Sequence, residues 1–456
     1  MFMQEVIKML RYNTGTDKKA FVKFNDRFDA VIFNATIVAY SGSAVADLVS
    51  VHKNQYIIDP QTHIMQHDIM AIMSKDKKTD QYVIKKSVRK YLENLPEKVL
   101  NIIELEKRYL NYQEIDAITG ELVECVYSFE TEFVNGFVKK KDYDKYLQYA
   151  QIRLEPRVVI APYFMLKKDM SDESKELYMN LNRKCLQEFI AYNNEHKKLT
   201  VAAQLVIDKE VLSDVNLLKQ IENTYAFDGY EYIFLWINDF SSWEVKREEK
   251  EAFYNLVRLL NRKGKKPIMA YGGFDSILLC HRQMDARLFG VAQSVGYGEQ
   301  RTITPVGGGL PVNKYYFGPT HRRIRFDEAL YLLMEKEYFS DDKTNWEHAE
   351  DYYKNICDCP TCKEIIKKDI DNFRVYNEST PYLVKGKYGD IKRNRPTTGA
   401  TLVAAYHFLY RKVIEWDSIE KEELKNLIDE LIENYETYGT QKEINNIKEW
   451  CEIFAK

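Results

Sequence analysis

The chain has 456 residues, 45% of them hydrophobic and 30% charged, so it is long enough for one large domain with appendages or for two domains. Its formal net charge is only -3, with 66 basic and 69 acidic residues, and the overall charge therefore demands no polyanionic partner. No apolar run approaches the roughly 18 to 20 residues that cross a bilayer, residues 1–5 lack the character of a secretory signal, and seven cysteines, four of them far apart, do not suit a disulfide framework. We expect a cytoplasmic protein with no membrane partner.

Apolar runs rich in β-branched residues recur along the chain. Residues 29–39 predict a buried strand or a strand pair, and residues 55–58 predict a short strand that ends on Asp59. Most later strands are followed by a helical segment, and this alternation predicts a parallel sheet covered by helices. The later strands are expected at residues 157–164, 199–207, 232–237, 267–271 and 286–292, and the helices at residues 172–193, 213–224, 247–263 and through Leu278.

The number of expected strands approaches eight, which favours a (β/α)8 TIM-type barrel over an open doubly wound sheet. The G-x-G-x-x-G turn of the open dinucleotide-binding fold is missing after the first strand, and residues 307–309, three glycines, predict a flexible loop rather than a phosphate cradle. Lys, Glu and Tyr dominate residues 75–155, where apolar residues recur at helical spacing. The predicted organisation is the first part of the barrel at 1–74, a helical insertion at 75–155, the rest of the barrel at 156–345 and a zinc-binding helical subdomain at 346–456.

Three cysteines lie within six residues, at Cys357, Cys359 and Cys362, and His407 follows on a predicted helix. Three thiolates and one imidazole can complete a closed tetrahedral site, which is the coordination of structural zinc. Four protein ligands leave no position for a substrate water, so this ion would hold structure and do no chemistry. The alternative is a chance cluster of reduced cysteines in a loop.

Basic residues gather in two stretches despite the balanced total charge. Residues 301–325 combine five basic residues with aromatic ones, and residues 363–395 carry nine Lys and Arg against five acids. Basic and aromatic side chains together suit a phosphate backbone with stacking bases, although an ordinary solvated surface is the alternative for both stretches. Residues 382–399 are expected to be irregular, after which Thr397 or Thr398 can cap a helix over 402–416, with a second helix over 424–432.

A (β/α) barrel followed by Cys-x-Cys-x-x-Cys and a helical histidine resembles the tRNA-guanine transglycosylase family, which makes queuosine and archaeosine and includes relatives that insert 7-deazaguanine bases into DNA. The strand that ends on Asp59 is similar to the family strand whose aspartate opens the base pocket. Gln204, within Ala203-Gln204, resembles the family's base-reading glutamine. The stretch from Pro267 through Gly272 and Gly273 is similar to the family's late Pro-x-x-x-x-Gly strand.

The resemblance implies a purine or deazapurine base, a nucleic-acid partner that is tRNA or DNA, structural Zn2+, and a homodimer or a heteromeric complex. The chain departs from the family in three places. Pro60-Gln61-Thr62-His63 replace the glycine-rich residues that follow the family's pocket aspartate. The 44 residues between Cys362 and His407 exceed the usual gap, and residues 286–290, where the nucleophilic aspartate is expected just after Asp285, contain no acid.

Base exchange needs one carboxylate that attacks the sugar and a second that moves protons on the base. We expect Asp59 to handle the base and Asp239, which follows the strand 232–237, to act as the nucleophile, with Gln204 bonded to a purine edge. The alternatives are a helix-cap or loop role for Asp239 and an ordinary turn at Asp59. Gly272, Gly273 and Tyr297 are further candidate substrate-binding residues, and a plain turn is the alternative for Tyr297.

Two histidines four residues apart, His63 and His67, lack an evident third ligand and are expected on the surface. Two functions from different classes remain open. One is an enzyme that exchanges or inserts a guanine-type base through a carboxylate glycosyl intermediate. The other is a noncatalytic nucleic-acid-binding or scaffolding subunit that works with a catalytic partner. A third reading is a barrel enzyme unrelated to base exchange in which the zinc is incidental.

Overall fold

The computed structural model describes residues 6–12, 17–51, 55–76, 78–140, 155–296, 314–386 and 389–455. The chain divides into two compact units. The barrel unit comprises Met1–Asn13, Asn25–Gly272 and Met284–Val306, and the C-terminal unit comprises Thr14–Phe24, Gly273–Gln283 and Gly307–Lys456. The segment 346–456, predicted as a subdomain, thus shares its unit with segments from earlier in the chain.

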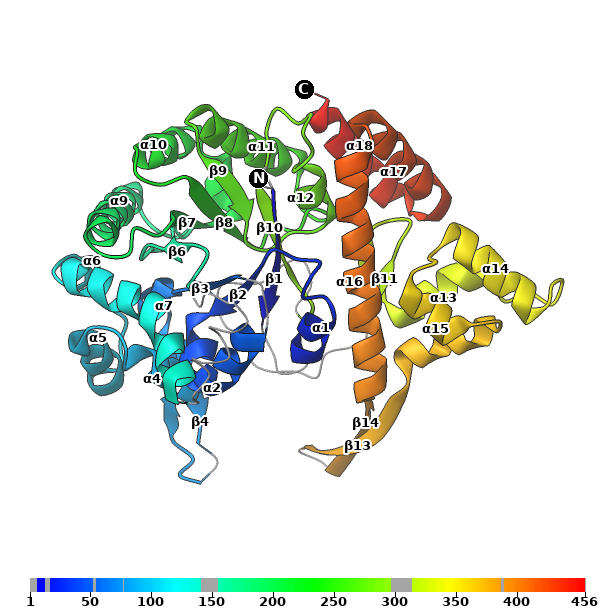
Figure 1. Ribbon diagram of the computed structural model, residues 1–456, viewed down its shortest axis with the longest axis horizontal. Helices are drawn as coiled ribbons and strands as arrows, with labels where there is room; N and C mark the ends of the chain where they lie inside the picture. The colour runs from blue at the N-terminus through cyan, green and yellow to red at the C-terminus, as the bar shows by residue number, and fades with distance from the viewer. Residues whose placement is uncertain are drawn as a thin grey trace. The chain divides into compact units, whose positions relative to one another are not determined.

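Eight parallel strands form the sheet of the barrel unit, in the order β3-β2-β1-β10-β9-β8-β7-β6 (Figure 1). The two ends of this sheet meet where the Arg157 N–H donates to the Tyr56 carbonyl at 2.8 Å, beside a parallel bridge from Tyr56 to Pro156. The sheet is therefore a nearly closed, TIM-like barrel, as predicted. Its strands are β1 (Ile7–Tyr12), β2 (Ala30–Asn34), β3 (Gln55–Asp59), β6 (Val159–Ile160), β7 (Val201–Asp208), β8 (Tyr232–Asn238), β9 (Lys266–Met269) and β10 (Gly290–Ser294).

The N-terminal part of the barrel differs from the prediction. Strand β1 was not expected, because Lys8 and Arg11 interrupt its apolar pattern. The predicted strand or strand pair over 29–39 is wrong beyond Asn34, where helix α2 (Ala35–Val51) begins. Its alanines favour a helix once the chain has left the sheet.

Every second residue of a strand faces the barrel interior, where large apolar side chains from all parts of the sheet pack into one cluster. One strand pair approaches too closely for any side chain. A Cβ on Gly290 would lie 2.7 Å from the carbonyl oxygen of Ile7, its partner on β1. Glycine at this position therefore permits β10 to pair with β1.

Helices surround the sheet within the barrel unit, and α7 packs against both α2 and α9. The described part of residues 75–155 is mainly helical and begins with one arm of a small hairpin. None of the helices in the described ranges has both the length and the apolar character that a membrane span requires. The elements are η1 (Thr62–Gln66), α3 (Ile69–Ile72), β4 (Met73–Lys75), β5 (Tyr82–Ile84), α4 (Lys86–Leu92), α5 (Glu97–Asn101), η2 (Ile102–Glu106), α6 (Tyr112–Asp116), α7 (Thr119–Lys140), α9 (Asp172–Glu195), η3 (Lys209–Ser213), α10 (Val215–Tyr225) and α11 (Arg247–Arg262).

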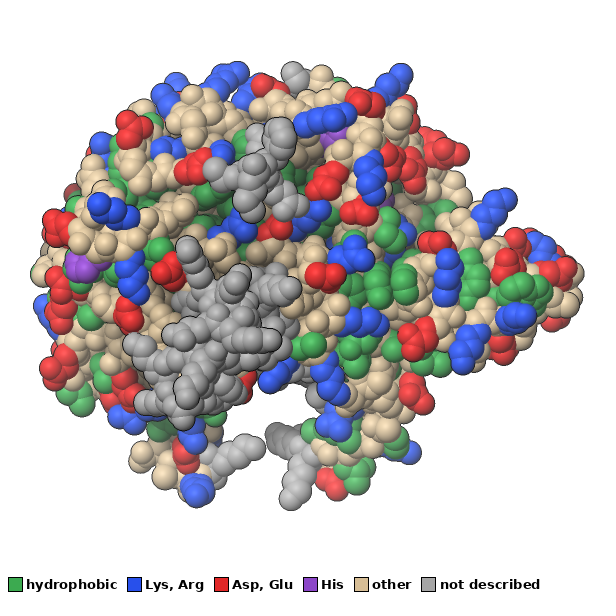
Figure 2. Space-filling model, in the orientation of Figure 1, with side chains coloured by type: hydrophobic (Ala, Val, Ile, Leu, Met, Phe, Trp, Pro, Cys, Tyr) green, Lys and Arg blue, Asp and Glu red, His purple; other side chains and the backbone are tan. Residues whose placement is uncertain are grey.

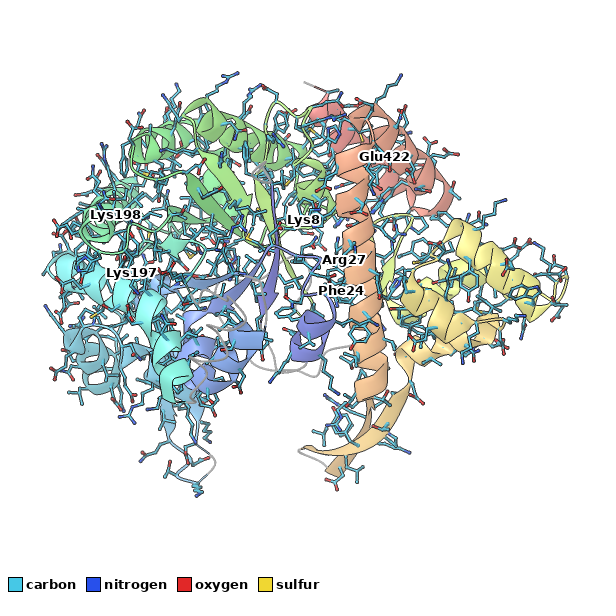
Figure 3. The ribbon with its side chains drawn as sticks, viewed as in Figure 1. Lys8, Phe24, Arg27, Lys197, Lys198 and Glu422 are labelled. Carbon is cyan, nitrogen blue, oxygen red and sulfur yellow. The ribbon has the colours of Figure 1, made fainter. Side chains whose placement is uncertain are left out.

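Helix α16 (Thr398–Lys421) runs through the C-terminal unit. The Thr397 side chain accepts from the Ala400 N–H at 3.0 Å, which confirms the predicted cap. Phe24 packs edge-on against Tyr410 of α16 at 4.7 Å, and the Glu422 carbonyl at the end of this helix accepts from the His281 ring at 3.0 Å (Figure 3). The other elements of the unit are α1 (Asp17–Lys23), α12 (Phe274–Leu278), β11 (Lys314–Phe317), β12 (Arg322–Arg325), α13 (Phe326–Glu335), α14 (Asn345–Asn355), α15 (Pro360–Ile366), η4 (Ile370–Asn377), β13 (Ser379–Gly386), β14 (Gly389–Pro396), α17 (Leu424–Tyr438) and α18 (Gln441–Phe454).

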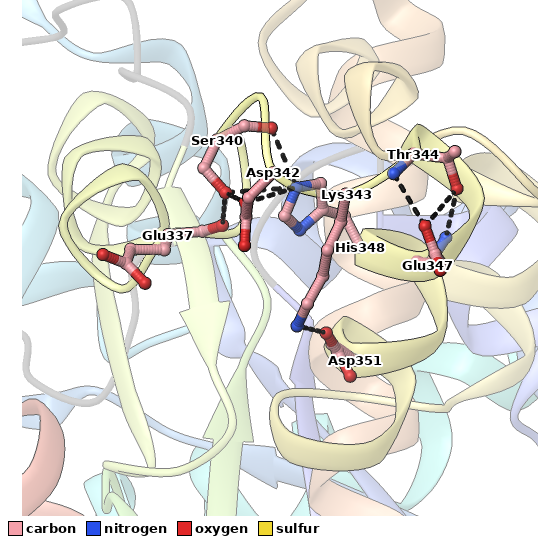
Figure 4. A network of polar contacts seen from close by, with 8 residues as sticks. All are labelled: Glu337, Ser340, Asp342, Lys343, Thr344, Glu347, His348 and Asp351. Atoms are coloured by element: carbon pink, nitrogen blue, oxygen red, sulfur yellow. Dashed lines mark hydrogen bonds and ion pairs between the residues drawn. The ribbon is translucent and has the colours of Figure 1, made fainter.

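A capping box fixes the start of α14 (Figure 4). The Thr344 side chain accepts from the Glu347 N–H at 3.3 Å, and the Glu347 carboxylate accepts from the Thr344 N–H at 2.8 Å. One turn later the buried ring of His348 donates to the Ser340 carbonyl at 3.0 Å. These bonds matter for the site described next, because α14 carries Tyr352 into it.

Candidate functional site

Four buried side chains in the C-terminal unit form a cluster with the geometry of a metal centre. The ligand atoms of Cys357, Cys359, Cys362 and His407 all lie within 4.8 Å of one another. His407 Nδ1 is 3.8, 3.4 and 3.3 Å from the three sulfurs in turn. A tetrahedral ion bound to sulfur and nitrogen at the usual zinc distances gives S···N edges of about 3.6 Å. The predicted ligands thus come together at a spacing that one ion can bridge.

The local sequence places the cysteines at the start of a helix. Cys359 is the N-cap of α15, Pro360 occupies the first helical turn, and the Cys362 N–H points at the Cys359 sulfur at 3.5 Å. Proline is preorganised for this position, and the positive end of a helix favours thiolate over thiol. The Cys-Pro-x-Cys segment therefore presents two sulfurs from one rigid turn.

Neighbouring groups orient the histidine ring. His407 Nε2 donates to the Tyr316 carbonyl at 2.7 Å, so Nδ1 is the ring nitrogen that faces the sulfurs. The ring also stacks on Tyr315, with centroids 4.5 Å apart and an angle of 12° between the planes. Sequence spacing alone did not identify Tyr315 or Tyr316. Both lie on β11, about 90 residues before His407, and local sequence patterns do not reveal contacts over such a separation.

Two further tyrosines surround Cys362. The hydroxyls of Tyr352 and Tyr376 lie 3.2 and 3.3 Å from its sulfur. Hydroxyl donors of this kind stabilise a thiolate and tune a metal site.

A buried cluster with several thiolates needs a positive charge. Burial lowers the pKa of His407, but Cys357 and Cys359 outweigh burial and raise it to about 10. A divalent cation at the centre would supply that charge to the sulfurs directly.

A buried network of charges lies beside the cluster. Lys412 Nζ is 3.0 Å from a Glu415 oxygen and donates to the Tyr316 hydroxyl at 2.7 Å, while the His321 ring is 2.8 Å from the other Glu415 oxygen. Phe274 stacks on the His321 ring with centroids 3.6 Å apart. Burial opposes ionisation of Glu415, but Lys412 and His321 outweigh burial and lower its pKa to about 2. The network joins α16 to β11, and sequence reasoning missed it.

In the barrel unit, Asp59 is the last residue of β3. It shares the inward-facing side of the strand with Ile57 and is fully buried. Its Oδ2 is 2.9 Å from Arg11 Nη1, and its Oδ1 accepts from the Tyr163 hydroxyl at 2.6 Å. Burial raises the pKa of Asp59, but Arg11 and the Tyr163 hydrogen bond outweigh it and hold this pKa below its usual value. Asp59 is therefore an ionised carboxylate held in a buried ion pair.

The two histidines expected on the surface are buried beside this ion pair, and that expectation is wrong. His63 Nδ1 is 3.1 Å from the Tyr163 hydroxyl, and its ring meets the His67 ring edge-on at 5.2 Å. The interpretation failed because η1 turns this segment inward directly after β3. Burial, followed by the effect of His63, lowers the pKa of His67 to about 3, so this ring is neutral.

Gln204 also belongs to the barrel interior. It alternates along β7 with Ala202 and Val206, which are members of the interior cluster, and its side chain is 1% exposed. Neither its amide nitrogen nor its amide oxygen has a hydrogen-bond partner among the described residues. A buried amide with no partner is costly, so this position is suited to a ligand or an ordered water.

The other predicted site residues are placed differently. Asp239 follows β8 with φ of 58°, its side chain is 68% exposed, and it lies 3.4 Å from Lys209. The structure thus brings Asp59 and Gln204 to the barrel interior and leaves Asp239 on a loop. Gly272 and Gly273 follow β9 closely, and Gly273 is the N-cap of α12. Tyr297 lies outside the described residues.

A second carboxylate at a strand end was missed. Asp208 ends β7 on the inward-facing register of Gln204, accepts from the Asn238 side chain at 2.6 Å and accepts from the Lys168 N–H at 2.8 Å. Its position two residues beyond Val206 was the available signal, because residues of one parity share a face. Asp285, by contrast, comes before β10 and pairs with Arg258 at 3.8 Å.

Comparison of the sequence with known proteins assigns no family to this chain. No protein-family model matches the chain, and no curated protein matches it in sequence. The chemistry of the barrel interior and of the cysteine cluster therefore carries the functional assignment.

Proposed function

We propose that this chain is a tRNA-guanine transglycosylase-like protein, which binds a guanine or 7-deazaguanine base in its barrel and exchanges it into tRNA or DNA. The observation that carries the proposal is the unpartnered amide of Gln204 inside the same barrel as the ionised Asp59. A guanine edge offers both donors and acceptors, and an amide and a carboxylate that face the same barrel interior can satisfy both kinds. The order of the chain, a barrel and then a Cys3His cluster, is consistent with this family.

Base exchange requires a carboxylate that forms a bond to the anomeric carbon as the old base departs. Arg11 and the Tyr163 hydroxyl engage both oxygens of Asp59. This makes Asp59 a poor nucleophile, whereas a carboxylate with about four acceptor sites can still accept a hydrogen bond from a base. The nucleophile is then Asp239, as predicted from the sequence, or Asp208, which faces inward at the end of β7. Replacing each in turn separates these two assignments.

The cluster of Cys357, Cys359, Cys362 and His407 is proposed to hold structural zinc. Its three sulfurs and one nitrogen match the donor set that zinc prefers in closed tetrahedral sites. When bound, the ion would join α15 to α16 and would take no part in the reaction.

A noncatalytic nucleic-acid-binding or scaffolding subunit is the second candidate. The observation that favours it is the exposed side chain of Asp239, paired with Lys209, together with the absence of an acid in residues 286–290. In that case the barrel would still hold the base and a partner would supply the nucleophile.

The deciding experiment incubates the zinc-loaded protein with labelled guanine and either tRNA or duplex DNA. The enzyme predicts label in the polymer and loss of incorporation by at least about a hundredfold in Asp59→Asn. The exposed Asp26, 80% accessible, provides the matched control Asp26→Asn. Binding of tRNA or DNA without incorporation of labelled guanine into either polymer would support the noncatalytic subunit. Failure to bind guanine, 7-deazaguanine or nucleic acid would overturn both.

A further inference from the structure

The segment between Cys362 and His407 contains an exposed two-stranded ribbon. Strands β13 and β14 pair antiparallel along their whole length, from Ser379 opposite Pro396 to Gly386 opposite Gly389. The expectation of an irregular segment over 382–399 is therefore wrong, and the ribbon accounts for much of the 44-residue gap. Every residue of β14 from Gly389 to Arg395 is exposed.

The register assigns the side chains to two faces. Tyr382 lies opposite Arg393, and Thr380 lies opposite Arg395, so both arginines and the tyrosine share one face. The other face carries Leu383 opposite Lys392. Two apolar side chains remain accessible on the ribbon, with Leu383 67% exposed and Ile391 49% exposed.

The ribbon is basic, and the three cations of β14 are unpaired within the described residues. Its two strands contain four Lys and Arg against a single acid, Asp390. Lys392, Arg393 and Arg395 form no ion pair with any described residue, whereas other exposed cations of this unit, such as Arg325 and Lys421, do. Figure 2 shows Lys and Arg side chains beside hydrophobic ones in the region where Figure 1 draws β13 and β14.

This combination fits one class of partner. Unpaired arginines beside a tyrosine suit phosphates and base edges, and Ile391, which lies opposite Val384 on the same face, would contact thymine methyl groups. The major groove of B-form DNA is about 12 Å wide and admits a two-stranded ribbon, while the major groove of A-form RNA is too narrow for side chains to read. The shape of the ribbon therefore favours duplex DNA over duplex RNA.

We propose that the β13–β14 ribbon binds duplex DNA in the major groove, with Arg393 and Arg395 on its phosphates or guanine edges. The inference deepens the proposed function and rests on it for the role of the DNA, which would be the polymer that receives the base. The binding itself depends only on the ribbon. It gives the gap between Cys362 and His407 a role that the metal cluster does not require.

The test measures binding of the full, zinc-loaded chain to a labelled 30-base-pair DNA duplex, the same sequence as duplex RNA, and tRNA, over a range of salt concentrations. Arg393→Gln with Arg395→Gln should weaken DNA binding about tenfold or more and reduce the slope of log affinity against log salt by about 2. The control double variant is Arg282→Gln with Arg325→Gln, because both arginines are exposed and already paired with acids. Thermal unfolding verifies that both variants are folded.

Equal DNA affinity in the ribbon variant and the control would overturn the inference, and so would tighter binding of wild type to duplex RNA or tRNA than to DNA. The guanine incorporation assay separates this inference from the proposed function. DNA binding that depends on the ribbon, without incorporation of guanine, would support the inference and contradict the proposed enzymatic function. Incorporation into DNA that is unchanged in the ribbon variant, even at limiting DNA, leaves the enzyme standing and removes the ribbon's role.

Discussion

At the residue scale, His67 links the barrel interior to pH. Its folded-state pKa of about 3 lies below the unfolded value near 6.5, because burial disfavours the charged ring. Below pH 6.5 the unfolded chain binds a proton that the folded chain does not, so stability must fall as the pH falls towards 3. Between pH 6.5 and pH 5 this single ring contributes a loss of about 1.5 kcal/mol.

The His67→Gln variant should therefore flatten the dependence of stability on pH. We expect urea unfolding at pH 7, 6 and 5 to show a smaller loss of stability for the variant than for wild type, by about 2 kcal/mol between pH 7 and pH 5. His196 is exposed, and His196→Gln is the matched control. Parallel curves for all three proteins would mean that His67 becomes accessible and takes up a proton in the folded state.

Among the individual site residues, sequence spacing predicted some and missed others. Three cysteines within six residues predicted their own convergence, because a short turn cannot keep them apart. No local sequence pattern identifies the tyrosines around them, such as Tyr315 and Tyr352, because their role depends on contacts between distant segments. For the same reason Asp59 was found at a strand end, while its partner Arg11 was not.

At the element scale, Lys412 and Glu415 form a buried ion pair within α16, and both side chains bond the Tyr316 hydroxyl of β11. Both side chains are fully buried, so removing one leaves the other charge without its partner. Glu415→Met should lower the free energy of unfolding by about 3 to 5 kcal/mol, and the double variant with Lys412→Met should recover much of that loss. Urea denaturation of the single and double variants measures both values.

A double variant as unstable as Glu415→Met would show that Glu415 stabilises the protein by more than balancing the charge of Lys412. In that case the hydrogen bonds from Tyr316 and His321 to Glu415 would account for the stabilisation. Lys421→Met with Asp417→Met, an exposed pair on the same helix at 3.2 Å, is the control and should change stability by less than about 1 kcal/mol.

Elements with continuous apolar runs were the ones that sequence predicted best. Strands β7 and β8 are buried on both faces and are almost continuously hydrophobic, which is typical of parallel sheets. Strand β1 and the β13–β14 ribbon were missed because charged side chains interrupt the first and cover the second. A solvent-exposed ribbon buries little, so its strands need no apolar pattern.

At the scale of the whole molecule, each unit has its own hydrophobic cluster. The cluster of the barrel unit is built from inward-facing strand residues. The cluster of the C-terminal unit includes Cys357, Cys359 and Cys362 among its buried members, so the proposed ion would sit inside a core rather than at its edge. Metal binding and folding of the C-terminal unit should therefore be coupled.

Removing the metal should accordingly loosen the C-terminal unit first. After treatment with a strong chelator at neutral pH, we expect a lower melting temperature and faster proteolytic cleavage within residues 314–455 than within residues 155–296, because the thiolates lose the cation that neutralises them. Cys359→Ser should show the same cleavage without chelator and little further response to it, while Cys125→Ser, outside the cluster, should behave as wild type. Restored zinc should reverse the effect in wild type. Cleavage that is indifferent to chelator would mean that packing of the tyrosines and cysteines alone holds this core together.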